Sequence, residues 1–503
     1  MKKEKMRAGN FKRIIALAVI LGVIFSGLFY APAAYASGSK DNIEYLKSVM
    51  DMIKERYGGQ ISDEQLIEGA LKGMFRVMDP YTTYFTPDEA NEFLTDLGGT
   101  YEGIGAALEK KGEYIVVIKV FPSSPAERAG ILSGDKIATV GGVSVAGASV
   151  EEAVRMIRGP AGTKVVLGIV RSGLDAMLSI EVERAEIRIN PVSYEIRGDI
   201  GYIKLESFNS NAGDYMTKAL KEMNAKKIKK IILDLRDNPG GDVAEAVKVA
   251  RKFVPKGLIA KLDFKSEAKA DIEYLSYLAR TKYKLAVLVN GATASAAEIV
   301  AGAVQDTGAG TLIGSRTFGK ALVQSLVPLL TADAYKKYEE MLGVKVVDAH
   351  DLIEKHGIMP SNDEIMGWTK MTTGIYTTPH GRMINGKGLE PDIRVEDPAP
   401  VNGIDVRGIS KLTVTWKPDL GSEGPDVLNA EKILKMLGYD VDTPDFELDR
   451  KTYDAIWKFR VDSGLWAGGV LDFTTQKKLN EVLDGLIVKI DKQYAKAVEV
   501  LSR

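Results

Sequence analysis

The chain has 503 residues, of which 67 are Lys or Arg, 68 are Asp or Glu, 45% are hydrophobic and none is cysteine. This composition excludes a disordered chain, a collagen-like fibre and a disulfide scaffold, and the length allows several domains. The net charge of −1 gives no general attraction to DNA or RNA, so nucleic acid is not an expected partner. With no cysteine and three histidines, we expect no metal site, and a hydroxyl as the nucleophile of any enzyme.

Residues 1–36 have the three parts of an export signal. A basic start is followed by the apolar run Ile14–Tyr30 and by the small-residue pattern Ala34-Tyr35-Ala36. The apolar run is at the short limit for crossing a bilayer, so a retained membrane anchor and a cleaved signal both remain open. We therefore expect the rest of the chain to work outside the cytoplasm, in the cell envelope or after secretion.

Two segments of different periodicity come next. Residues 41–98 carry apolar side chains at helical spacing, with Ser62 and Gln65 at the positions of a capping box, and they predict a small helical domain. Residues 99–184 contain short β-rich runs separated by Gly- and Pro-containing turns, with one helix over Val150–Ile157. This second segment predicts a compact mixed module.

Three further segments complete the chain. Residues 185–400 alternate buried-type strands with helices, which predicts an α/β core with a partly parallel sheet. Residues 401–421 lie in a stretch rich in Pro, Gly and Asp and are assigned as a linker, while residues 422–487 have the periodicity of a small helical domain. The sequence thus predicts a multidomain protein with α/β and α+β parts.

Ser295 and Glu298 lie where a predicted strand gives way to a helix. Their spacing is that of a capping box, and on local evidence a structural cap is the simpler interpretation. The alternative is a catalytic hydroxyl, because the free N–H groups and the positive end of the helix dipole at such a turn can stabilise an oxyanion. Both interpretations are open at this point, and a nucleophilic serine would also need a base.

Lys320, which follows Ser295 by 25 residues, is the candidate base. A lysine accepts a proton near neutral pH only where apolar surroundings lower the pKa of its amine, and Phe318 is suitable material for the wall of such a pocket. Gln324 comes four residues later and could orient the amine. A solvated lysine in a turn is the simpler alternative.

Two glycine motifs could present backbone N–H groups to a ligand. Gly240 and Gly241 follow a predicted strand, where adjacent glycines allow a substrate oxygen to approach, although an ordinary strand-to-helix turn explains them equally well. Gly103, Ile104 and Gly105 precede a strand of the mixed module, where consecutive amides could hold a chain-terminal carboxylate. A simple turn is the default alternative for this second motif.

Taken in order, these motifs resemble the carboxyl-terminal processing proteases, also called tail-specific serine proteases, over residues 41–400. The resemblance rests on Leu66-Ile-Glu-Gly-Ala with Asp79-Pro-Tyr-Thr-Thr-Tyr84, Tyr101-Glu-Gly-Ile-Gly-Ala, Arg158-Gly-Pro-Ala-Gly-Thr163, Asp234-Leu-Arg-Asp-Asn-Pro-Gly-Gly241, the pair Ser295 and Lys320, and Thr378-Pro-His-Gly. It implies a PDZ domain at residues 99–184 and a crotonase-like protease core at residues 185–400 that works without a cofactor.

The same resemblance implies a set of catalytic residues. Ser295 matches the nucleophile, Lys320 the base, and Gln324 the residue that helps to hold the lysine. His380 falls in a matching motif but is not the family's base, so a Ser/His/Asp triad is not expected.

Backbone groups and one arginine complete the implied site. The oxyanion hole would be formed by the N–H group of Ala296 together with that of Gly240 or Gly241. The loop Gly103–Gly105 would bind the substrate's terminal carboxylate. Arg158 would relay the state of the PDZ domain to the protease, although a plain turn arginine is at least as good an explanation.

Two segments lie outside the common pattern. Residues 331–371 form an insertion with His350 and His356, in which we expect a surface helix and no metal site. Residues 422–487 resemble a small peptidoglycan-binding module. The alternative is a plain helical bundle with Trp457 and Phe459 in its core.

The resulting hypothesis is a serine endopeptidase of the cell envelope that captures the C-terminal tail of protein or peptide substrates and cleaves nearby. Peptidoglycan and a second copy of the chain are further candidate partners. The alternatives are a non-catalytic PDZ scaffold on the cell wall, in which Ser295 is only a helix cap, and a ligand-binding protein built on the same core. The presence of both Ser295 and Lys320 favours the protease, because a scaffold needs neither residue.

Overall fold

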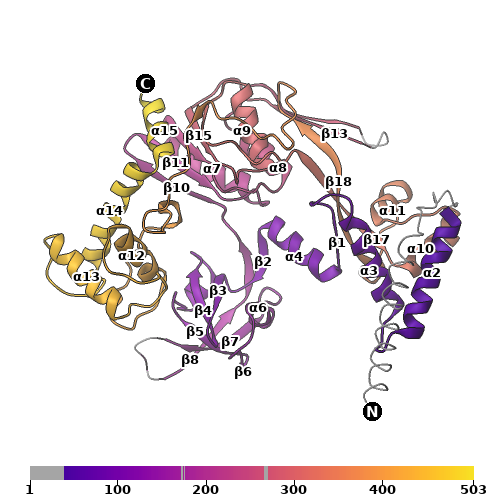
Figure 1. Ribbon diagram of the computed structural model, residues 1–503, viewed down its shortest axis with the longest axis horizontal. Coiled ribbons are helices and arrows are strands. Elements are labelled where there is room, and N and C mark those ends of the chain that lie inside the picture. Colours follow the sequence, from indigo (N-terminus) through magenta and orange to yellow (C-terminus); the bar gives the residue numbers. More distant parts are fainter. Residues whose placement is uncertain (1–38, 172–173, 175, 266–269) are drawn as a thin grey trace, which may run out of the picture. The chain divides into compact units, whose positions relative to one another are not determined.

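The computed structural model describes residues 39–171, 174, 176–265 and 270–503, and its helices and strands are labelled in Figure 1. The predicted export signal lies outside the described residues. Within them, no helix combines the length and the apolar character needed to cross a membrane. The chain divides into two compact units, Met1–Pro80 and Tyr81–Arg503.

The first unit contains two described helices, α2 (Ser39–Arg56) and α3 (Asp63–Arg76). The predicted capping box is confirmed: the N–H of Gln65 donates to the Ser62 hydroxyl at 3.2 Å, and the N–H of Ser62 donates to the Gln65 side chain at 2.9 Å. No residue of α3 is buried.

The second unit begins with β1 (Thr83–Phe85) and α4 (Pro87–Gly98), followed by the mixed module. Its main sheet has the order β3-β4-β5-β7-β8 with β6 beside β5, while β2 pairs with β9, and α6 packs on β3 and β5. The elements are β2 (Thr100–Gly103), β3 (Ala106–Lys111), β4 (Tyr114–Val120), α5 (Pro125–Arg128), β5 (Lys136–Val140), β6 (Val143–Ser144), α6 (Val150–Ile157), β7 (Lys164–Val170), β8 (Leu178–Glu183) and β9 (Ala185–Arg188).

The α/β core is built on a six-stranded sheet of order β10-β11-β12-β15-β16-β19, which is parallel except for the β10–β11 pair. Alternate residues of its strands face opposite sides. Ile231 and Leu233 pack in the cluster that includes α7, α8 and α9, whereas Ile232 packs with the last helix, α15. The elements are β10 (Val192–Arg197), β11 (Ile200–Leu205), α7 (Ala212–Ala225), β12 (Lys230–Asp234), α8 (Val243–Ala250), β15 (Lys284–Val289), α9 (Ala296–Asp306), β16 (Thr311–Gly314) and β19 (Ile393–Arg394).

A second, antiparallel sheet joins β1, β13, β14, β17 and the long strand β18. The insertion forms two helices and a short 3₁₀ turn around a small apolar cluster, rather than one surface helix, and its last residues already belong to β18. The elements are β13 (Gly257–Phe264), β14 (Ile272–Ser276), β17 (Leu322–Leu330), α10 (Ala332–Leu342), α11 (Ala349–His356), η1 (Asn362–Glu364) and β18 (Ile365–Thr377).

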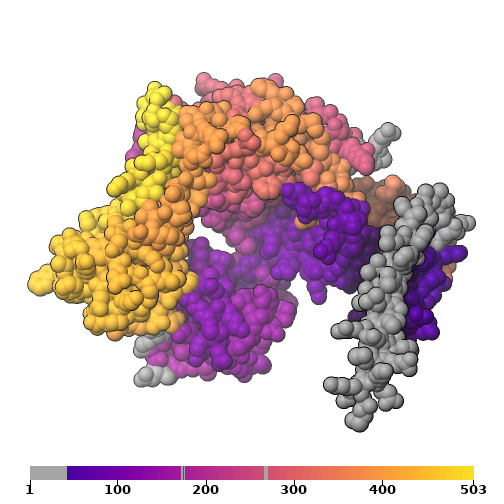
Figure 2. Space-filling model, in the orientation of Figure 1, coloured from indigo at the N-terminus to yellow at the C-terminus, as the bar shows by residue number. Residues whose placement is uncertain are grey.

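The C-terminal part has its own apolar core. It consists of η2 (Val406–Gly408), α12 (Pro425–Met436), α13 (Arg450–Asp462), α14 (Phe473–Ile490) and α15 (Lys492–Ser502). Phe459 is buried in this core as expected, whereas Trp457 is 46% exposed and does not belong to it. The helical structure continues beyond residue 487, and α15 packs on β12, β15 and β16 of the α/β core. Figure 2 shows this last helix, in yellow, against the core.

Candidate active site

Ser295 occupies the turn between β15 and α9, and its backbone has a conformation that residues other than glycine rarely adopt. Its φ is 54° and its ψ is −119°. A non-glycine residue with positive φ is strained, and strain of this kind concentrates at functional sites. The Glu298 half of the predicted capping box is formed, because its carboxylate accepts the Ser295 N–H at 2.9 Å. The Glu298 N–H donates to the backbone oxygen of Ser295 at 2.8 Å.

Glu298 joins Ser295 to Lys320. Its side chain is fully buried. One carboxylate oxygen, Oε2, accepts the backbone N–H of Ser295 at 2.9 Å and that of Lys320 at 2.8 Å. The other oxygen accepts the Thr317 hydroxyl at 2.5 Å and the N–H of Gly319 at 2.8 Å. A single buried group thus fixes the backbone of the candidate nucleophile and of the candidate base.

Lys320 lies in the loop between β16 and β17. Its Nζ is 4.6 Å from the centroid of the Tyr81 ring. The Tyr376 hydroxyl donates to the backbone oxygens of both Ser295 (3.0 Å) and Lys320 (3.2 Å), and burial, followed by the nearby Glu298 carboxylate, raises the pKa of Tyr376 well above its usual value. Phe318 is 53% exposed, and the Tyr81 ring provides an aromatic face beside the lysine amine.

Gln324 and His380 differ in their relation to this pair. Gln324 lies on β17, which begins two residues after Lys320, and its amide donates to the Thr372 hydroxyl at 3.3 Å. His380 is exposed and lies 3.7 Å from Asp306, the last residue of α9. Ser295 precedes the first residue of that helix, so about 16 Å of helix separates the two ends. The structure therefore links the backbone of Lys320, and not that of His380, to the backbone of Ser295 through Glu298 and Tyr376.

The glycine loop after β12 lies directly beside the serine. The Cα of Gly240 is so close that an added Cβ would stand 2.8 Å from the Cβ of Ser295. The Gly240 N–H donates to the Asn238 side chain at 2.9 Å and is therefore occupied. In contrast, the N–H groups of Gly241 and Ala296 make no hydrogen bond within the described part of the chain. Of the two glycines considered, Gly241 is the one whose N–H can take part in an oxyanion hole.

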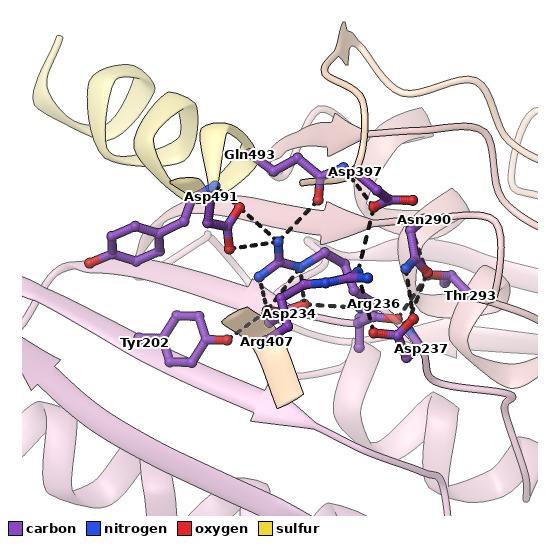
Figure 3. Close-up of polar contacts among 12 residues, drawn as sticks. Tyr202, Asp234, Arg236, Asp237, Asn290, Thr293, Asp397, Arg407, Asp491 and Gln493 are labelled. Carbon is purple, nitrogen blue, oxygen red and sulfur yellow. Dashed lines mark hydrogen bonds and ion pairs between the residues drawn. The ribbon is translucent and has the colours of Figure 1, made fainter. Parts of the chain in front are cut away.

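The base of the same loop is held by a buried ion network, shown in Figure 3. Arg236 donates to both carboxylate oxygens of Asp234, at 2.6–3.1 Å, and Tyr202 donates to Asp234 at 2.6 Å. Burial disfavours both charges, but their mutual attraction prevails, lowering the pKa of Asp234 and raising that of Arg236 well above its usual value. The loop therefore starts from a fixed charged pair.

The residues predicted to bind a substrate tail also come together. A cavity of about 90 Å³ lies between the Gly103–Gly105 loop and α6, and Arg158 lines it. The N–H groups of Ile104 and Gly105 make no hydrogen bond within the described residues. The Arg158 guanidinium lies 5.0 Å from the centroid of the Tyr101 ring, at the rim of the same cavity. This is the geometry of a groove that can take a chain end with its terminal carboxylate on the backbone amides.

No cluster of metal-ligating side chains occurs among the residues that the structure describes. His350 is exposed and lies 3.1 Å from Glu354 on α11.

Comparison with known proteins identifies the domains. Residues 199–395 match peptidase family S41, residues 94–170 match the PDZ domain, and residues 31–89 match the N-terminal domain of the activating protease CtpB. The chain is 32% identical to the carboxy-terminal processing protease CtpA of Bacillus subtilis, over 93% of this chain and 92% of the relative. It is 30% identical to CtpB of the same organism, over 90% and 87% of the two chains. Among solved structures, the photosystem II D1 C-terminal processing protease is 26% identical, over 69% of this chain and 86% of that chain, with a TM-score of 0.37.

The family matches and the two Bacillus relatives define a serine-type peptidase with a PDZ domain. The chain belongs to the carboxy-terminal processing proteases of peptidase family S41. The expected fold class is confirmed, and the protease hypothesis prevails over the scaffold and the ligand-binding protein.

Three residues of the site were not singled out from the sequence: Glu298 in its connecting role, Tyr376 and Arg236. In the sequence, Glu298 is recognisable only as half of a capping box, because its partners near Lys320 are distant along the chain. A buried charge within an apolar helix was the available signal, since α9 is otherwise composed almost entirely of small and apolar residues.

Proposed function

We propose that this peptidase cleaves protein substrates near their C-terminus with a Ser295/Lys320 dyad. The observation that carries the proposal is the Glu298 carboxylate, because one of its oxygens holds the backbone N–H groups of both residues. A scaffold or a helix cap would not require this link to the Lys320 loop. Gln324 supports the base from β17, where its bond to Thr372 fixes the side chain.

The geometry supports a two-step acyl transfer. The Lys320 amine takes the proton of the Ser295 hydroxyl while the serine oxygen attacks the scissile carbonyl. The N–H groups of Gly241 and Ala296 stabilise the oxyanion that forms. The lysine gives the proton to the departing amine. A water molecule, deprotonated by the same lysine, then attacks the acyl-enzyme, and the lysine returns this proton to the Ser295 oxygen as the acyl–oxygen bond breaks.

The PDZ groove is proposed to capture the substrate tail through its terminal carboxylate. The free N–H groups beside Gly105 support this role, since a charged acceptor is bound more strongly than a neutral one. Arg158 at the rim of the groove is proposed to transmit occupancy to the protease.

The experiment is to incubate the purified protein with a globular protein that ends in an apolar tail, as the free acid or the amide, and to analyse the fragments by mass spectrometry. We expect cleavage near the C-terminus, and weaker cleavage of the amidated substrate at subsaturating concentration. Absence of cleavage would contradict the proposed function, and equal rates would remove the carboxylate-binding role of the loop.

We further propose that residues 1–36 direct the protein to the cell envelope, and that the C-terminal domain binds peptidoglycan. The exposed rings of Trp457 and Trp466, the latter 90% exposed, support the second role, because an indole presents a large flat apolar face to a sugar. Co-sedimentation with purified peptidoglycan should be lost in Trp466→Ala. Retained co-sedimentation would argue against this surface, and recovery of the protein only in the cytoplasmic fraction would argue against export.

A further inference from the structure

The last helix of the chain, α15, is packed on the protease core rather than on the helical domain that precedes it. Tyr494, Ala497 and Leu501 are buried in one cluster with Ile232 and Leu288 of the parallel sheet. The sheet face that they cover is opposite to the one covered by α7, α8 and α9. The C-terminus is therefore an integral layer of the protease.

The residue at the start of α15 reaches into the ion network beneath the active site (Figure 3). Asp491 accepts two hydrogen bonds from the Arg236 guanidinium, at 2.8 and 2.9 Å, and Gln493 accepts a third at 3.0 Å. Arg236, Asp491 and Gln493 are all at most 3% exposed. The Gln493 amide in turn donates to Asp397 at 3.0 Å, so the network continues into the segment after β19.

Arg236 immediately precedes the loop that carries the oxyanion donor. The loop begins with Asp237, whose φ of 63° is strained for a residue with a side chain. Asn290, from the turn that leads to Ser295, bonds Asp237 twice, at 2.8 and 3.0 Å. A shift of Arg236 would therefore be transmitted to the loop and to its Gly241 N–H, whose position the reaction depends on.

The network is better suited to fixing a position than to adding stability. Burying an ion pair contributes little net stability, because the loss of hydration offsets most of the attraction. Arg236 already has a bidentate partner in Asp234, so Asp491 is not needed to neutralise it. Asp491 instead restricts the orientation of the guanidinium from a second side. Its carboxylate binds Nη1 of Arg236, which makes no hydrogen bond to Asp234.

We propose that Asp491 is a positioning residue of the protease: through Arg236 it fixes the loop that supplies the oxyanion donor, so that docking of the C-terminal segment 491–503 completes the active site. The proposal rests on the proposed function of the Gly241 N–H. Residues 491–503 thus support the protease, although they follow the helical domain that is proposed to bind peptidoglycan.

The test is Asp491→Asn in the full-length protein. Asparagine can still accept the Tyr494 N–H, as the cap of α15 does now at 2.9 Å, but it carries no charge for Arg236. The matched control is Asp449→Asn, which changes another helix-capping aspartate, at the start of α13, whose side chain accepts the Thr452 N–H. Kinetics on a peptide substrate and inhibition by a peptide aldehyde, which forms a tetrahedral oxyanion on the serine, are measured for both.

We expect Asp491→Asn to lower kcat by at least about tenfold, with KM changed less than about twofold, because an oxyanion donor acts mainly in the transition state. Affinity for the aldehyde should fall in parallel, and Asp449→Asn should behave as wild type. Gln493→Met, which removes one acceptor and keeps Asp491, should show a smaller change in the same direction, and it provides the test should Asp491→Asn not fold.

A wild-type kcat in folded Asp491→Asn, an effect on KM alone, or an equal loss in the control would overturn the proposal. An inactive wild-type protein would instead contradict the proposed function, so the two failures are distinguishable.

Discussion

Replacing Glu298 with glutamine should disconnect the serine from the lysine. The carboxylate accepts four hydrogen bonds, and the glutamine amide has one oxygen in place of two. Because the Thr317 hydroxyl can turn to accept, the NH₂ group of the glutamine faces one backbone donor, Gly319, in one orientation and two, Ser295 and Lys320, in the other. Either orientation leaves an N–H group of the Lys320 loop without an acceptor and loosens its link to Ser295.

The size of the effect follows from these bonds. A hydrogen bond to a charged group contributes about 1.5–3 kcal/mol, so the loss of one or two amounts to about 1.5–6 kcal/mol, a large part of the stability of a typical domain. The unpaired N–H groups can reach water or another acceptor only if the segments of Ser295 and Lys320 move apart. A displacement of about 1 Å between reacting groups can lower a rate by about 10²-fold, so we expect kcat to fall by that factor or more.

The assay combines steady-state kinetics with urea unfolding, and Glu245→Gln is the matched control. Glu245 is also buried, but it accepts the N–H of Gly213 at 2.8 Å and the Lys248 amine at 2.6 Å, and so it holds neither Ser295 nor Lys320. The control should lose stability while keeping most of its kcat. A folded Glu298→Gln protein with a kcat within about twofold of wild type would refute the reasoning.

Three further predictions concern other parts of the molecule. Gly240→Ala should lower kcat at least about tenfold without abolishing tail binding, because its Cβ would stand 2.8 Å from that of Ser295 at a φ of 100°; normal kinetics would show that the loop can yield. Gly105→Ala should weaken tail binding measured by fluorescence anisotropy, since its Cβ would lie 2.4 Å from the Ser124 Cβ, and unchanged affinity would argue against the groove. Burial raises the pKa of Glu431 from 4.5 to about 7, so the stability associated with its protonated form is complete below about pH 4.5 and is lost as pH rises through 7. Relative to Glu431→Gln, the wild type should therefore lose about 2–3 kcal/mol of unfolding free energy over this range in urea titrations, and a constant difference would contradict the shift.

Local pattern was sufficient for most elements of the fold. The helix Val150–Ile157 begins and ends where the sequence predicts, and short strands alternate with turns over residues 99–184 as expected. These elements have one apolar face each, and their ends are marked by capping residues or by Gly and Pro. Such signals are local, so they can be recognised without knowledge of the tertiary structure.

The site was only partly predictable, because its decisive contacts are long-range. The choice between Gly240 and Gly241 depends on which N–H the Asn238 side chain occupies, and the sequence does not show this. The Tyr81 ring beside the Lys320 amine comes from a distant segment, so the sequence around Lys320 does not indicate it. Asp491 lies beyond the residues that the helical pattern assigned to the last domain, and its partner is 255 residues away.

Cleavage of a tail-bearing substrate by Ser295→Ala and by Lys320→Ala, followed by mass spectrometry, tests the dyad most directly. The two groups act as one unit, so each loss should cost about as much as both together. We predict that each variant folds, binds the tail and yields no cleavage above background, while His380→Ala cleaves as wild type does. Substantial turnover by folded Lys320→Ala, or loss of activity in folded His380→Ala, would contradict the account.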